Sequence, residues 1–150
     1  MHYIQQLLEN RLIITSIVAW LIAQLLKIIT DTIETKKFDL NLVLASGGMP
    51  SSHTSFVTSL GFGVGFTEGF NSTAFAICAV LAMVVMYDAA GVRRAAGKQA
   101  AVLNLIMSRM EYRGLKIDVK LKELLGHTPV EVSAGALLGF VVALVSFVLI

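Results

Sequence analysis

Residues 46–53 read Ser-Gly-Gly-Met-Pro-Ser-Ser-His and stand between two apolar stretches of the chain. Glycine and serine favour a loop, and Pro50 suits the first position of a helix that continues into the apolar run behind it. The first turn of a helix presents unsatisfied N–H groups and a partial positive charge, which together favour an anion such as phosphate. The stretch therefore predicts a loop that delivers Ser51, Ser52 and His53 to an anion-binding helix start.

The composition of the rest of the chain is that of a membrane protein. Of its 150 residues, 56% are hydrophobic and only 15% are charged, and the mean hydropathy is +0.78. A soluble domain averages roughly 25% charged residues. The net charge of +2 gives no reason to expect a nucleic-acid partner. The length suits one domain, so we expect residues 1–150 to form a single integral membrane domain.

Four apolar stretches predict an all-α fold, a polytopic membrane helical bundle with four spans. They cover Leu12–Ile29, Pro50–Thr67, Ser72–Tyr87 and Val132–Ile150. Two further stretches, Ala95–Met110 and Val119–Leu125, predict amphipathic helices on the membrane surface. Glycines also recur every four residues, a spacing typical of close helix pairs and of oligomers in membranes. These glycines are Gly61, Gly65 and Gly69 in one stretch and Gly135 and Gly139 in another.

The order of the spans predicts a topology in the cell membrane. Both termini fall on one side of the bilayer and the loop at residues 46–53 on the other. Of the 12 Lys and Arg residues, all except Arg11 fall on the side of the loop. Because positive side chains accumulate on the cytoplasmic side, we expect the loop to face the cytoplasm and both termini to lie outside. This topology requires that residues 95–110 do not cross the membrane.

A second polar stretch, Gly126-His127-Thr128-Pro129-Val130-Glu131, repeats the construction of the first. Phosphoryl transfer through a histidine needs an imidazole that a carboxylate holds in one tautomer, and a second group that protonates the leaving oxygen. His127, Glu131 and His53 supply these three groups as candidate catalytic residues. The chemistry requires no metal ion and no other cofactor.

Cations and N–H groups are also expected around the phosphoryl oxygens. The candidate phosphate-binding residues are Ser51, Ser52, Gly47, Gly48, Arg93, Arg94, Lys27 and Asp88. Several have a simpler structural interpretation. The two serines suit a helix cap, the two arginines suit lipid headgroups, and the stem of Lys27 suits the membrane edge. Asp88 suits an ion pair with one of the arginines, and residues 128–131 fit a capping box.

Three blocks of the sequence resemble the divergent branch of the type 2 phosphatidic acid phosphatase family, whose members are described as acid phosphatase/vanadium-dependent haloperoxidase-related. The blocks are residues 47–55, 87–100 and 126–132. The resemblance implies a membrane phosphatase that acts on a lipid phosphate or diphosphate through a phosphohistidine intermediate. It also implies that His127 is the nucleophile, that Glu131 orients it, and that His53 protonates the leaving group.

The sequence departs from the wider superfamily at several positions. Ser52 replaces a glycine, Glu131 replaces an aspartate, and Leu121 stands where an arginine precedes the nucleophile. A Lys followed seven residues later by Arg-Pro is also absent, since Glu34 stands at that offset from Lys27. A non-catalytic membrane protein that binds phospholipid or assists assembly is therefore the alternative to a lipid phosphatase. A small transporter subunit is a third interpretation.

Overall fold

The computed structural model describes residues 2–36, 48–112, 119–123 and 125–149, and all regular structure in these ranges is helical. This confirms the expected all-α fold. The helical segments are α1 (His2–Glu9), α2 (Arg11–Thr35), α3 (Ser52–Glu68), α4 (Thr73–Tyr87), the π-helical turn η2 (Asp88–Val92), α5 (Arg93–Tyr112), α6 (Pro129–Leu144) and the π-helical turn η3 (Val145–Leu149).

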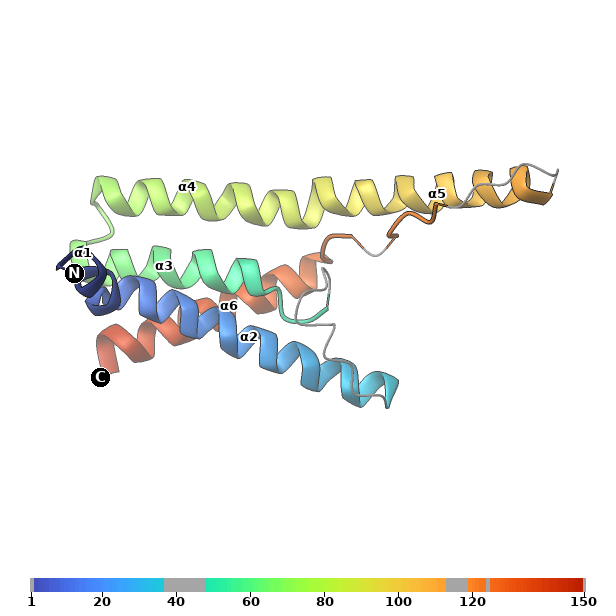
Figure 1. The fold of residues 1–150 in the computed structure, drawn as a ribbon. Coiled ribbons are helices and arrows are strands. Elements are labelled where there is room, and N and C mark those ends of the chain that lie inside the picture. The colour runs from blue at the N-terminus through green and yellow to red at the C-terminus, as the bar shows by residue number, and fades with distance from the viewer. Residues whose placement is uncertain (1, 37–47, 113–118, 124, 150) are drawn as a thin grey trace.

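Helices α2, α3, α4 and α6 form a bundle in which α3 packs against each of the other three (Figure 1). Within the described ranges, three helical stretches are long and apolar enough to cross a membrane, namely Arg11–Ile33, Thr73–Met110 and Pro129–Leu149. Helix α3, with 17 residues, stands at the short end of the roughly 17–25 residues that a bilayer requires. The chain is thus a multi-pass helical membrane protein, with both termini at the same end of the bundle (Figure 1).

Small residues let α3 and α6 approach closely. A Cβ atom on Gly139 would lie 2.5 Å from the Ser55 carbonyl oxygen, and one on Gly135 would meet the Ser51 carbonyl oxygen. The Ser55 hydroxyl donates to the Gly135 carbonyl at 2.9 Å and so joins the two helices. The predicted close-packing role of Gly135 and Gly139 is confirmed. In the other glycine series, Gly61 faces Cys78 of α4 at an ordinary van der Waals distance, whereas a Cβ atom on Gly65 would meet the ring of Phe70 in the turn after α3.

Helices α4 and α5 form one long rod, with η2 between them (Figure 1). At about 1.5 Å per residue, the 38-residue stretch Thr73–Met110 is about 57 Å long, almost twice a hydrocarbon core of about 30 Å. The expected helix over residues 95–110 is present, but it continues α4 in line. It projects beyond the bundle at the end opposite the termini (Figure 1).

The expected helix over residues 119–125 is wrong. Residues 119–123 and 125 form no helix and run back along α5 toward the bundle (Figure 1). The Asn104 amide explains the difference, because it donates to the Leu121 carbonyl at 2.8 Å and accepts from the Leu121 N–H at 2.9 Å. These two bonds satisfy the backbone of Leu121 in place of helical bonds.

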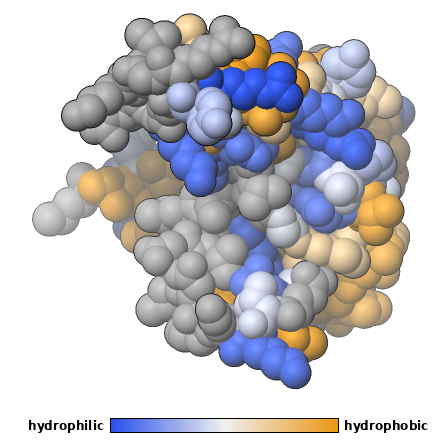
Figure 2. All heavy atoms as spheres, turned by 90° about the vertical axis from the view of Figure 1, so that its right-hand side faces the viewer, coloured by the Kyte–Doolittle hydropathy of each residue, from blue (hydrophilic) through white to orange (hydrophobic). Residues whose placement is uncertain are grey.

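The end of the bundle opposite the termini is polar. Figure 2 views this end and shows hydrophilic side chains gathered on it, while hydrophobic side chains lie along the flank behind them. Helix α5 leaves the bundle here, and α6 begins here (Figure 1). The sequence motifs around His53, Asp88 and His127 therefore share one end of the molecule.

Replacing Gly139 by Ala is expected to lower the stability of the bundle by about 1–3 kcal/mol, because the new methyl group overpacks the contact between α3 and α6. Thermal unfolding of the purified protein in detergent measures this loss. The matched control is Gly91→Ala, since a Cβ atom there meets nothing within 4 Å. Equal unfolding temperatures for the two variants would contradict the close helix contact.

Candidate functional site

The loop before α3 is tied to α2. Gly48 has φ of +87°, and a Cβ atom on it would lie 3.0 Å from carbons of the Lys27 side chain. The Thr30 hydroxyl donates to the Met49 carbonyl at 2.9 Å. Lys27 is only 3% exposed, so its side chain packs beneath the loop instead of reaching along the membrane edge to water. Gly47, predicted to bind phosphate with Gly48, lies outside the described residues.

Ser51 begins α3 as its N-cap. Its hydroxyl oxygen accepts from the Thr54 N–H at 3.5 Å and from the Thr54 hydroxyl at 3.0 Å, and the residue is fully buried. Pro50 precedes this cap, so its predicted place as the first helical residue is wrong by two positions. Ser52 is also buried, whereas His53 is exposed. His53 is thus the side chain that the helix start presents at the polar end.

The first turn of α6 combines two roles that the sequence left as alternatives. The Thr128 hydroxyl accepts from the Glu131 N–H at 3.3 Å, and Glu131 accepts from the Thr128 N–H at 3.4 Å, which completes the predicted capping box. The same Glu131 oxygen lies 2.7 Å from Nδ1 of His127. Glu131 therefore closes the helix end and orients the histidine at once.

The turn η2 fixes the backbone of His127. The His127 N–H donates to the carbonyl of Ala89, a residue of this turn, at 2.9 Å. The preceding Gly126 has φ of +83°, and a Cβ atom on it would lie 2.5 Å from the Arg94 nitrogen and 2.9 Å from the Ala89 oxygen. A Cβ atom on Gly97 would likewise meet the Glu123 carbonyl oxygen. Glycine is thus needed at both positions for the returning chain to lie against the rod.

The two predicted catalytic histidines share a pocket. This smaller pocket has a volume of about 250 Å³. It is lined by His53, Val84, Val85, Asp88, Ala89, Arg93 and His127. Nε of Arg93 lies 2.6 Å from a carboxylate oxygen of Asp88, which confirms the predicted ion pair. Arg93 and the two histidines are therefore brought together as expected.

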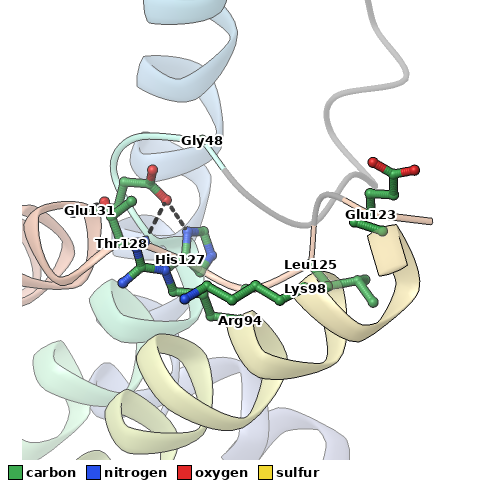
Figure 3. A pocket seen from close by; sticks show the side chains of 11 residues that line it. Gly48, Arg94, Lys98, Glu123, Leu125, His127, Thr128 and Glu131 are labelled. Atoms are coloured by element: carbon green, nitrogen blue, oxygen red, sulfur yellow. Dashed lines mark hydrogen bonds and ion pairs between the residues drawn. The ribbon is translucent and has the colours of Figure 1, made fainter. Parts of the chain in front are cut away.

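A larger pocket of about 390 Å³ meets the smaller one at His127. Its lining residues are Gly48, Arg94, Gly97, Lys98, Ala101, Glu123, Leu125, Gly126, His127, Thr128 and Glu131. Figure 3 shows Arg94 and Lys98 extending from α5 toward the pair formed by His127 and Glu131. The two arginines predicted to act together thus line different pockets.

The surroundings of His53 disfavour its charged form. His53 is the second residue of α3 and is exposed at the start of that helix. Partial burial lowers its pKa, and the positive charges near it, Arg93 first, lower that pKa further. Asp88 acts in the opposite direction. A bound anion would favour the imidazolium form, so ligand binding and protonation of His53 are expected to be coupled.

Sequence reasoning missed four residues of this region. Lys98 and Glu123 line the larger pocket, Ala89 accepts the hydrogen bond from His127, and Gly97 admits the returning chain. Lys98 carried a usable signal, because it follows Arg94 by four residues and so shares its helix face. Nothing in the sequence marks Ala89, since its contribution is a backbone carbonyl.

The fold and the site define a multi-pass helical membrane protein in which two histidines share a pocket at one end of the bundle. The chain belongs to the divergent PAP2 family, which the three motif blocks predicted, and the family model matches residues 8–142. It is 41% identical to the uncharacterized membrane protein YuiD of Bacillus subtilis (strain 168), over 93% of this chain and 96% of that protein. No solved structure matches the chain.

Replacing Arg93 by Gln is expected to raise the pKa of His53, because it removes a nearby positive charge that opposes protonation of the ring. Replacing Asp88 by Asn is expected to lower that pKa, because the carboxylate favours the charged ring. Titration of the His53 ring signals by NMR measures both shifts. Arg109→Gln, in the last turn of α5, is the control and should leave the titration unchanged.

Proposed function

We propose that this protein is a membrane phosphatase that hydrolyses a lipid phosphate or diphosphate through a phosphohistidine intermediate. One observation carries the proposal. His127 contacts Glu131 through Nδ1 at 2.7 Å and lines the same pocket as His53. A histidine oriented by a carboxylate, with a second histidine beside it, is the arrangement that phosphoryl transfer through nitrogen requires. Membership of a family related to phosphatidic acid phosphatases supports the same reaction class.

The mechanism starts from the tautomer of His127. When the proton of the neutral ring is on Nδ1, this N–H donates to Glu131, and the lone pair on Nε2 is free to attack phosphorus. The new N–P bond forms as the bond between phosphorus and the leaving oxygen breaks. His53 gives its proton to that oxygen, which departs with the lipid as an alcohol or, from a diphosphate, as a monophosphate. His53 then accepts a proton from water, which cleaves the N–P bond and releases phosphate.

The walls of the smaller pocket suit the two ends of such a substrate. Arg93 supplies N–H groups for the phosphoryl oxygens. Val84 and Val85 supply an apolar wall, and Val84 is 61% exposed on the flank of α4. A lipid chain is thus expected to enter from the side of the bundle while its headgroup reaches the histidines. The lipid substrate and the surrounding bilayer are accordingly the proposed partners.

A second candidate function is phospholipid binding without turnover. Two observations favour it. Arg93, which lines the pocket that both histidines share, is already paired with Asp88 at 2.6 Å. Leu121, at the position where the superfamily has an arginine, lines neither of the two pockets. In this case the wild-type protein would bind lipid phosphates and release no phosphate from any of them.

The substitution His127→Ala is expected to abolish phosphate release from lipid phosphates, because it removes the nucleophile. His53→Ala is expected to lower the rate by about 100-fold to 10,000-fold, the usual contribution of a general acid. Phosphate release from lipid monophosphates and diphosphates in mixed micelles measures both effects.

His2→Ala is the matched control, because His2 is exposed at the far end of the bundle and lines neither pocket. Circular dichroism establishes that each variant is folded. Unchanged turnover in a folded His127→Ala protein would refute the phosphohistidine mechanism.

We also propose that the site faces the cytoplasm. All 12 Lys and Arg residues except Arg11 belong to the half of the topology that contains the site. The site residues themselves contribute to this excess. Lys36, Arg109 and Lys120 line neither pocket, however, and they belong to the same half of the topology.

In a Cys78→Ser background, a cysteine at position 2 is expected to react with a membrane-impermeant maleimide in intact cells. A cysteine that replaces Lys120 is expected to react only after the membrane is permeabilised. Both positions are exposed, so accessibility within the protein is matched. The reverse labelling pattern would place the site on the outer face.

A further inference from the structure

The larger pocket presents two cations on one face of α5. Arg94 and Lys98 stand four residues apart, one helical turn, and both line this pocket. Both residues are exposed, so their heads are accessible to a water-soluble ligand. Figure 3 shows that they extend toward His127, which is the wall that this pocket shares with the smaller one.

The two cations of this pocket are not paired with its two carboxylates. Glu123 accepts from the Asn104 amide at 2.7 Å, and Glu131 contacts His127 and the Thr128 N–H. Among the described residues, Arg94 and Lys98 have no ion pair and no side-chain hydrogen bond. A guanidinium has five N–H donors and an ammonium has three, and neither can accept. The group that would complete this pocket is therefore rich in acceptor oxygens.

Arg93 and Lys27 sharpen this contrast. Arg93, in the smaller pocket, already has its carboxylate partner at 2.6 Å. Lys27 is buried behind Gly48, which forms part of the wall of the larger pocket. The negative partner of Arg93 thus faces the other pocket, and Lys27 does not line the larger one.

We propose that Arg94 and Lys98 form a second anion subsite, which takes a phosphate group in addition to the one at the histidines. The inference rests on the proposed function in placing the reacting phosphoryl group in the smaller pocket. The volume of about 390 Å³ accommodates a phosphate beside His127. Two groups fit this description: the second phosphoryl group of a lipid diphosphate, and inorganic phosphate that has been released by hydrolysis.

Isothermal titration calorimetry of the full-length protein in detergent with inorganic phosphate tests the subsite. Arg94→Gln combined with Lys98→Gln is expected to weaken one binding step by about tenfold or more, because two charged donors are lost. Arg109→Gln removes a cation from the same helix outside the pocket and should leave every step unchanged. Binding steps of the double variant that stay within about twofold of wild type would overturn the proposal.

Kinetics with lipid monophosphate and lipid diphosphate of the same chain distinguish these two groups. A loss of kcat/KM in the double variant that is about tenfold greater for the diphosphate assigns the subsite to the second phosphoryl group of the lipid. An equal loss for both lipids, with inhibition by inorganic phosphate weakened about tenfold, assigns it to the released phosphate. If the wild type turns over neither lipid, the proposed phosphatase function fails, and the phosphate titration still decides the subsite on its own.

Discussion

A close approach between two backbones holds the site together. The chain that returns along α5 meets the α4–η2–α5 rod so tightly that Gly97 and Gly126 leave no room for a Cβ atom. At the end of this contact, the His127 N–H donates to the Ala89 carbonyl at 2.9 Å. The turn η2 follows the π pattern, since the Arg93 N–H bonds to the Asp88 carbonyl five residues back. An extra residue in the rod thus coincides with the place where the returning chain is fastened. This bond ties His127 to the turn that follows α4.

Structure and proposed chemistry share groups throughout the site. Glu131 caps α6 and contacts His127, and its carbonyl accepts from the Ser51 N–H at 3.0 Å, which links the starts of α6 and α3. Ser51 in turn caps the helix that presents His53. The helix start that presents His53 and the helix start that follows His127 are therefore bonded to each other. Because capping and orientation depend on the same carboxylate, a structural and a functional interpretation of Glu131 are not alternatives.

The sequence predicts the helices and the end of the bundle at which the motifs meet, because apolar length, caps and glycine spacing are local signals. It predicts the pair of His127 and Glu131 for the same reason, since both belong to one turn. The failure at residues 119–125 has a non-local cause. Charged residues there resemble an amphipathic helix, but the backbone of Leu121 bonds to the Asn104 side chain, 17 residues earlier in the chain. The role of the Ala89 carbonyl is equally invisible, because any residue type supplies the same atom.

The basic pair Arg93-Arg94 shows how helix geometry divides neighbours that look equivalent in sequence. Successive residues of a helix point about 100° apart, so adjacent side chains do not enter one narrow pocket together. Arg93 turns toward His53 and meets Asp88, whereas Arg94 aligns with Lys98 one turn later. His127 stands between the two directions and lines both pockets. His127 thus has a cation paired with Asp88 on one side and, on the other, two cations that are unpaired among the described residues. The unpaired cations therefore belong to the proposed second anion subsite, while the smaller pocket combines Arg93 and both histidines with the apolar wall of Val84 and Val85 and so suits the reacting phosphoryl group and the lipid chain.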